Sequence, residues 1–109
     1  MKTTKTTPAS ATQKLIAVLK PALDRDLSFR QVALLLHVSE NPGTRLTFGE
    51  IGTATAIPSK PAVTRAADRL QTEKLLTRQP DPQDNRRVLL SLTAAGNKLA
   101  AQIVGSFGA

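Results

Sequence analysis

The chain has 109 residues, a length that suits one domain and is too short for two. Its 15 Lys and Arg residues against 8 Asp and Glu residues give a net charge of +7, which favours a polyanionic partner. The absence of Cys and the single His, His37, exclude disulfides, thiolate catalysis and Cys-ligated zinc, so we expect no metal and no cofactor.

Residues 1–11 are polar, basic and rich in Thr, which predicts a disordered arm. This arm is either an inert tail or a source of extra phosphate contacts through Lys2 and Lys5. The chain has no secretory signal and no apolar stretch long enough to span a membrane, so a cytoplasmic location is expected. The folded domain is predicted to cover residues 12–104, with a frayed tail at 105–109.

The first predicted helix covers residues 12–23, where Leu and Ile recur at helical spacing. Pro21 lies late in this segment, and its missing N–H predicts that the helix ends or bends near Lys20. Apolar residues lie on more than one face of this helix. A helix that packs on a single lobe needs only one apolar stripe, so we expect the additional apolar side chains to be covered by another surface.

A second helix is predicted over Ser28–Ser39, because Ser28 can cap it and Gln31 stands three residues later, as in a capping box. Phe29 is expected on its apolar face, together with residues one turn apart along the helix. Further Leu residues widen the apolar band. This pattern indicates a helix at the centre of the domain.

The next segment is typical of a helix-turn-helix unit. A short helix is predicted over residues 48–54, with Thr47 as its cap and Phe48 facing inward. After a break, Ser59 begins a longer helix that covers residues 59–74. In such a unit the N-terminal end of the second helix enters the major groove of DNA.

The outward face of the helix over residues 59–74 is polar and basic, so its side chains can donate hydrogen bonds to base edges and phosphates. An ordinary solvated helix face is the alternative interpretation. The DNA-binding residues that we predict on this helix are Ser59, Lys60, Pro61, Thr64, Arg65 and Arg69.

Two predicted strands within residues 75–92 flank a polar loop rich in turn-forming residues, which indicates a β-hairpin. Residues 79–87 of this hairpin are expected to form a wing, whose Arg86 and Arg87 reach the minor groove of DNA. Asp84 is expected either to hold one guanidinium group in a fixed orientation or to cap the turn. A last helix, over residues 94–104, follows the hairpin.

Three segments stand in a recognisable order: Leu27-Ser-Phe-Arg-Gln31 at a helix start, Ile57–Leu70 in the helix-turn-helix, and Asp84-Asn-Arg-Arg87 followed by Leu92-Thr93-Ala-Ala-Gly96. Together they resemble the MarR (multiple antibiotic resistance regulator) family of transcription factors. The resemblance implies a winged helix-turn-helix fold, mainly α with a small β-hairpin wing. It also implies a transcriptional regulator, usually a homodimer on a pseudo-palindromic DNA site.

The leading functional hypothesis is a sequence-specific regulator that binds double-stranded DNA. A winged-helix protein-interaction module without sequence-specific DNA binding is the alternative, and the position of the charge decides between them. Residues 59–87 hold seven Lys and Arg against four Asp and Glu, which favours nucleic acid. An enzyme is not expected, because the chain offers neither a nucleophile with an adjacent base nor paired carboxylates in a cleft.

A homodimer is the expected assembly, since a two-fold partner is the commonest cover for surplus apolar surface on terminal helices. The short terminal helices predict that this dimer is weak. The alternative is a monomer whose terminal helices fold back over the domain. No feature of the sequence supports a small-molecule effector, although members of the family that the chain resembles often bind one.

Overall fold

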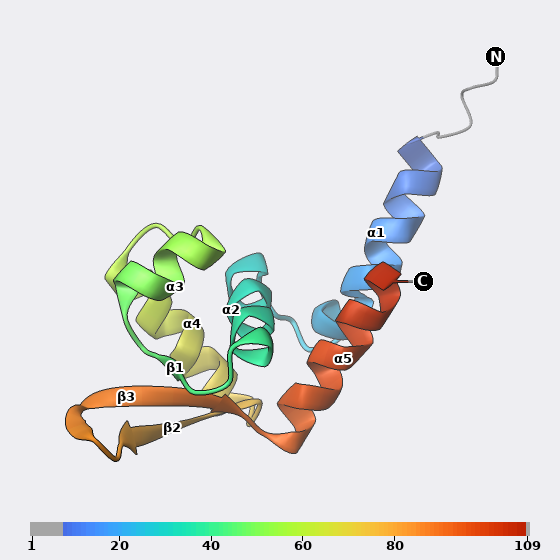
Figure 1. Ribbon diagram of the computed structural model, residues 1–109. Helices are drawn as coiled ribbons and strands as arrows, with labels where there is room; N and C mark the ends of the chain where they lie inside the picture. The colour runs from blue at the N-terminus through green and yellow to red at the C-terminus, as the bar shows by residue number, and fades with distance from the viewer. Residues whose placement is uncertain (1–7, 109) are drawn as a thin grey trace.

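The structure is a computed structural model that describes residues 8–108. In chain order its elements are α1 (Pro8–Leu23), α2 (Phe29–Glu40), β1 (Thr44–Arg45), α3 (Phe48–Thr55), α4 (Lys60–Thr72), β2 (Leu76–Asp81), β3 (Asp84–Leu92) and α5 (Ala94–Gly108) (Figure 1). The chain is mainly helical and carries one small sheet with a projecting hairpin. The predicted winged helix-turn-helix fold is therefore confirmed.

The central helices begin at the capping residues that the sequence contains. Ser28 Oγ accepts a hydrogen bond from the Gln31 N–H, and Gln31 Oε1 accepts one from the Ser28 N–H, so the predicted capping box is complete. Thr47 and Ser59 cap α3 and α4, each accepting from a backbone N–H three residues later. Because each cap satisfies a first-turn N–H, these short contacts determine where the helices start.

The hydrophobic core surrounds α2, which packs against α3, α4, α5 and β3. Leu34 and Leu35 of α2 have no exposed surface. α4 buries one stripe of residues against this core and leaves its opposite face outward. The other large, fully buried side chains of the core are Val38, Ile51, Ile57, Val63, Leu70, Leu75, Leu76, Leu90 and Ile103.

The sheet is antiparallel, with strand order β1-β3-β2. β2 and β3 extend further into the predicted polar loop than expected, because Pro80 still pairs with Val88 across the hairpin. β1 was not predicted, since a strand of two residues is too short to show an alternating pattern. Thr44 of β1 pairs with Leu90, which fixes the loop before α3 to the base of the hairpin.

Both terminal helices are longer than the sequence predicted. α1 begins at Pro8, one turn early, because proline is tolerated in a first turn, where its missing N–H is not needed. α5 continues to Gly108, because one internal glycine such as Gly105 costs a helix only about 1 kcal/mol. Residues 1–7 of the predicted arm and residue 109 of the predicted tail lie outside the described residues.

The sequence predicted that the first helix ends or bends near Lys20, but α1 does not end there and continues through Pro21 to Leu23. The proline ring removes one backbone hydrogen bond, but the Asp24 N–H still donates to the Lys20 carbonyl at 2.8 Å. Ala22, beside the proline, is 1% exposed, so the core holds this last turn in place. The chain then reverses at Asp26, whose φ of 59° lies in the left-handed region.

Two aromatic side chains that were predicted to be buried lie at the surface. Phe29 is 74% exposed, because it lies in the first turn of α2, where no other element covers it. Phe48 is 40% exposed, and its ring lies over Gly52, where an added Cβ would come within 2.6 Å of the ring. Helical spacing marks an apolar face but does not show how far along the helix the neighbouring elements extend.

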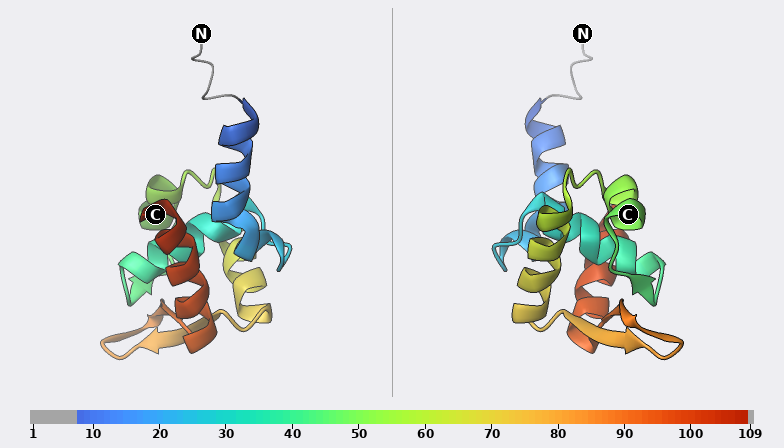
Figure 2. Two further views of the ribbon diagram at one scale, coloured as in Figure 1. Left: turned by 90° about the vertical axis from the view of Figure 1, so that its right-hand side faces the viewer. Right: turned by 90° about the vertical axis from the view of Figure 1, so that its left-hand side faces the viewer.

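The terminal helices and the helix-turn-helix occupy different sides of the molecule. α1 packs against α5, and these two helices are in front in the left-hand view of Figure 2. α4 and the β2–β3 hairpin are in front in the right-hand view (Figure 2). Within residues 8–108, no helix is both long enough and apolar enough to cross a lipid bilayer.

Candidate nucleic-acid interface

The first two turns of α4 present a polar, basic face to solvent. Lys60, Pro61 and Arg65 are exposed, and Thr64 between them is partly exposed. Ser59 differs from these residues, because its hydroxyl oxygen accepts a hydrogen bond from the Ala62 N–H at 3.3 Å and thereby caps the helix. The remaining first-turn N–H groups and the helix dipole leave this end of α4 electropositive.

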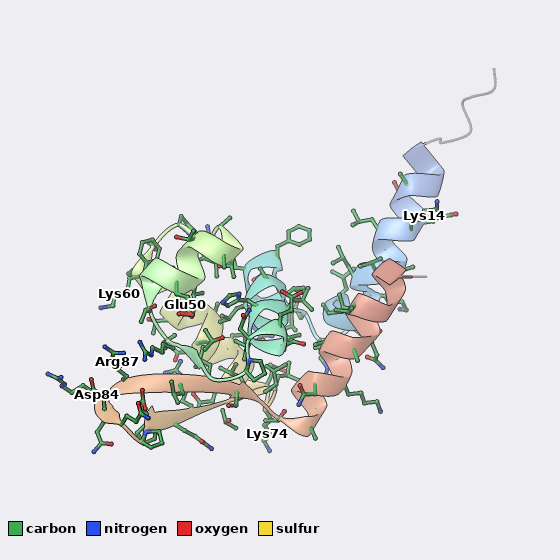
Figure 3. The ribbon with its side chains drawn as sticks, viewed as in Figure 1. Lys14, Glu50, Lys60, Lys74, Asp84 and Arg87 are labelled. Atoms are coloured by element: carbon green, nitrogen blue, oxygen red, sulfur yellow. The ribbon has the colours of Figure 1, made fainter. Side chains whose placement is uncertain are left out.

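Lys60 and Arg65 have no partner for their charge. In the described part of the chain, neither side chain forms an ion pair or a hydrogen bond. Figure 3 shows Lys60 projecting at the end of the molecule that also carries Arg87, far from Lys14 on α1. Two unpaired cations at a positive helix end make this surface suited to an external polyanion.

Arg69, which the sequence grouped with these residues, has a different environment. Its guanidinium donates to the carbonyl oxygens of Arg25 and Asp26, at 3.5 and 3.4 Å. Its Nε also lies 3.3 Å from a carboxylate oxygen of Glu73, without forming a hydrogen bond. These contacts link α4 to the turn between α1 and α2, so Arg69 differs from Lys60 and Arg65, whose charges have no partner among the described residues.

An ion pair connects the outward face of α4 to the sheet. Asp68 of α4 accepts a hydrogen bond from the guanidinium of Arg78 on β2. The pair neutralises the one acidic side chain that α4 presents beside Arg65 and Arg69. It also links the orientation of α4 to that of the hairpin. Sequence spacing did not indicate this pair, since the two residues lie on different elements.

The wing is organised around the Asp84 carboxylate. Asp84 Oδ1 accepts hydrogen bonds from the backbone N–H and from Nε of Arg86, both at 3.1 Å. The same carboxylate lies 3.4 Å from Nε of Arg87. The Arg86 side chain is nevertheless 91% exposed, so its guanidinium projects from the wing while its base is held. The structure thus brings together all three residues predicted at the wing.

The charge state of Asp84 follows from these contacts. The hydrogen bonds from the Arg86 side chain and backbone lower the pKa of Asp84, and the positive charges of Arg87 and Arg45 lower it further. Asp84 is therefore a carboxylate at neutral pH and can hold both wing arginines. Arg45 lies on β1, is exposed and was not singled out by the sequence, because β1 itself was not predicted.

A groove runs beside the outward face of α4. It has a volume of about 540 Å³ and is lined by residues 28–31 at the start of α2 and by Ala62, Arg65 and Ala66 of α4. The two segments are not neighbours in the sequence, because β1 and α3 lie between them along the chain. Arg30, an exposed residue in the first turn of α2, brings a second guanidinium to this groove.

The described residues suit binding better than reaction chemistry. No three His, Cys, Asp or Glu side chains among residues 8–108 gather in a way that could hold a metal ion. Asp68, Glu73 and Asp84, on or beside α4 and the wing, each contact arginine, and Asp81 of β2 accepts a hydrogen bond from the Gln83 N–H. What remains at the surface is a set of basic side chains that can form charge-assisted hydrogen bonds to phosphate.

The sequence profile of the MarR family matches residues 25–87 of this chain. That segment contains α2, the helix-turn-helix and most of the hairpin, and so includes every residue of the predicted site. No curated protein sequence matches the chain.

Solved structures share the fold over nearly the whole chain. The DNA complex of MepR from S. aureus is 25% identical, with a TM-score of 0.74 over 92% of this chain and 77% of that chain. A MepR mutant bound to an oligodeoxyribonucleotide is 22% identical, with a TM-score of 0.78 over 99% and 78% of the two chains. A mutant of MarR from E. coli is 23% identical, with a TM-score of 0.71 over 90% and 70%.

Proposed function

Because this chain belongs to the MarR family of winged helix-turn-helix transcriptional regulators, we propose that it reads a specific sequence of double-stranded DNA. α4 enters the major groove, and the wing lies at the adjacent minor groove. The observation that carries this proposal is the unpaired basic face of α4 formed by Lys60 and Arg65. The similar protein MepR occurs in a DNA complex, and regulators of this family are not enzymes.

Each residue of the surface has a distinct role in this proposal. Arg65 donates two hydrogen bonds to a base edge, as a guanidinium does to guanine, and Thr64 contacts the neighbouring base. Lys60 binds a phosphate as a point charge. Arg86 enters the minor groove, where a narrow width strengthens the negative potential. The residues that we propose to contact DNA are Ser59, Lys60, Pro61, Thr64, Arg65, Arg86 and Arg87. Asp84 orients the wing, and Arg69 braces α4.

Alanine replacements of Arg65 and of Arg69 should change different properties, DNA affinity in the first case and stability in the second. Arg65→Ala is expected to weaken binding to the DNA site that the wild-type protein selects from a random library. The loss should be roughly 1–3 kcal/mol, and sequence preference should relax, because the substitution removes a base contact. Its thermal stability should be unchanged, since the side chain has no partner in the described structure. Arg69→Ala should mainly lower stability, by about 1 kcal/mol, because it releases α4 from the turn at Asp26.

DNA selection from a random library with the purified protein supplies the site, and fluorescence anisotropy and thermal melting then measure both variants. If the Arg65→Ala variant binds the selected site as tightly as the wild-type protein does, the proposed position of α4 on the DNA is wrong. If the wild-type protein selects no duplex at all, the protein-interaction alternative replaces the DNA-binding proposal.

The apolar surface on α1 and α5 supports a homodimer. Leu15, Ile16 and Leu23 of α1 and Val104 of α5 are between 47% and 56% exposed, although they are large apolar side chains. They lie on the two helices that pack together on one side of the molecule (Figure 1). A second copy that covers this surface would place two copies of α4 about 34 Å apart, one turn of DNA.

Sedimentation velocity over a concentration series tests this assembly. At high protein concentration we expect a species with twice the 11.6 kDa mass of one chain, and we expect it to dissociate on dilution. Ile16→Asp should shift the protein to monomer without unfolding it, because 48% of this side chain is already exposed. Phe29→Asp is the matched control, since it places the same charge on an exposed apolar site outside α1 and α5. A species of 11.6 kDa at every concentration would contradict the dimer.

A further inference from the structure

Building on the proposed DNA binding, we propose that the groove between the start of α2 and α4 holds a phosphate of the DNA backbone. Arg30 of α2 is the main ligand of that phosphate, and Arg65 of α4 and Phe29 of α2 also line the groove. This site extends the DNA-binding surface to an element outside the helix-turn-helix and the wing. It also adds a contact that carries no sequence information.

The charged residues that line the groove favour the binding of an anion. Its lining contains two arginines and no acidic residue. Arg30, like Arg65, forms no ion pair or hydrogen bond within the described residues. Two unpaired guanidinium groups on one groove repel each other, whereas a phosphate in the groove would accept charge-assisted hydrogen bonds from Arg30 and reduce this repulsion.

The shape of the groove fits a segment of sugar–phosphate backbone. Its floor is made by Ala62 and Ala66, which are only 5% and 4% exposed and whose small side chains leave room above them. Phe29 stands at the edge with 74% of its surface in water. A deoxyribose that packs against this ring would cover apolar surface that no element of the domain covers.

Continuity with α4 identifies DNA as the occupant. Arg65 both lines the groove and belongs to the outward face of α4. DNA that contacts Arg65 in the major groove therefore brings the flanking backbone beside Arg30. The N-terminal end of the α2 dipole adds positive potential at the same place. A free inorganic anion is the competing occupant, and the experiment below separates it from DNA.

The test measures the affinity of the full chain for the selected site and for a scrambled duplex, at salt concentrations between 50 and 200 mM. Arg30→Ala should weaken binding to both duplexes alike, by roughly tenfold, because a phosphate contact is lost. The slope of log affinity against log salt should also become less negative, by about one for each protomer and therefore by about two for the proposed dimer. Phe29→Ala should weaken binding by about threefold with an unchanged slope, since it removes apolar contact and no charge.

Lys14→Ala is the matched control, because it removes one unpaired charge from α1, far from Lys60 and Arg87 (Figure 3). It should leave affinity and slope at wild-type values. Arg30→Lys should keep the salt slope, because it keeps the charge. All variants should melt at the wild-type temperature, since Arg30 and Phe29 are exposed.

Three results would overturn the phosphate site while the proposed function stands. The first is that the Arg30→Ala variant keeps the wild-type affinity and salt slope, while the Arg65→Ala variant loses binding. Calorimetric binding of inorganic phosphate that needs Arg30, combined with wild-type DNA affinity of Arg30→Ala, would assign the groove to a free anion. A loss confined to the selected site would make Arg30 a base contact. Failure of the wild-type protein to bind any duplex would instead reject the proposed function itself.

Discussion

Affinity for duplex DNA should fall on the order of a thousandfold when salt is raised from 50 to 200 mM. Each Lys or Arg that neutralises a phosphate releases a condensed counterion, and raising the salt opposes that release. In the proposed dimer, Lys60, Arg86 and Arg87 of each protomer would supply the cations. Neutralisation of about six phosphates by a dimer gives a slope near −5 in log affinity against log salt.

Fluorescence anisotropy titrations at several salt concentrations measure this slope. Circular dichroism over the same range is the control, because the core is built from apolar residues and the fold should not respond to salt. A flat response would mean that the basic face of α4 and the wing does not contact phosphate. It would favour the protein-interaction module over the DNA regulator.

Gly96→Ala should destabilise the domain by roughly 3–5 kcal/mol and lower its melting temperature by more than about 10 °C. A Cβ at Gly96 would lie 2.1 Å from the Leu75 carbonyl oxygen and 3.2 Å from Leu92 Cβ. The backbone oxygen cannot move away, because Leu75 also accepts a hydrogen bond from the Thr93 N–H at 3.1 Å. The start of α5 is thus locked to the corner between α4 and β2.

Gly105→Ala on the same helix is the matched control for Gly96→Ala. An added Cβ at Gly105 meets no atom within 4 Å. Alanine there should stabilise the domain by about 0.5–1 kcal/mol, because it removes the entropy cost of a glycine inside a helix. Thermal and urea unfolding of both variants measure the difference. Equal stability of the two variants would contradict the close packing of Gly96 on Leu75.

The sequence indicated the starts of α2, α3 and α4 and the burial of α4 correctly, because these features depend on neighbours along the chain. The caps at Ser28, Thr47 and Ser59 are hydrogen bonds between residues three apart. The stripe of α4 follows from helical periodicity, which places every third or fourth residue on one face. Lys60 and Arg65 were predicted by the same reasoning, since residues left out of a buried stripe face outward.

The roles of several charged and aromatic residues could not be predicted, because their neighbours lie far away along the chain. Arg69 looks like part of the outward face in any helical projection, yet it donates to the carbonyl of Asp26, 43 residues earlier. Arg78 and Asp68 pair across two elements. The exposure of Phe29 depends on which elements lie beside the first turn of α2, and no local pattern encodes this.

The sequence by itself determined the family, the order of the helices and hairpin, and the basic character of α4 and the wing. These features rest on capping residues, periodicity and charge, all of which act over a few residues. Only the tertiary structure decided which arginines brace the fold and which stay open. It also joined Arg30 to Arg65 across one groove, because packing brings α2 beside α4 while β1 and α3 separate them in the chain.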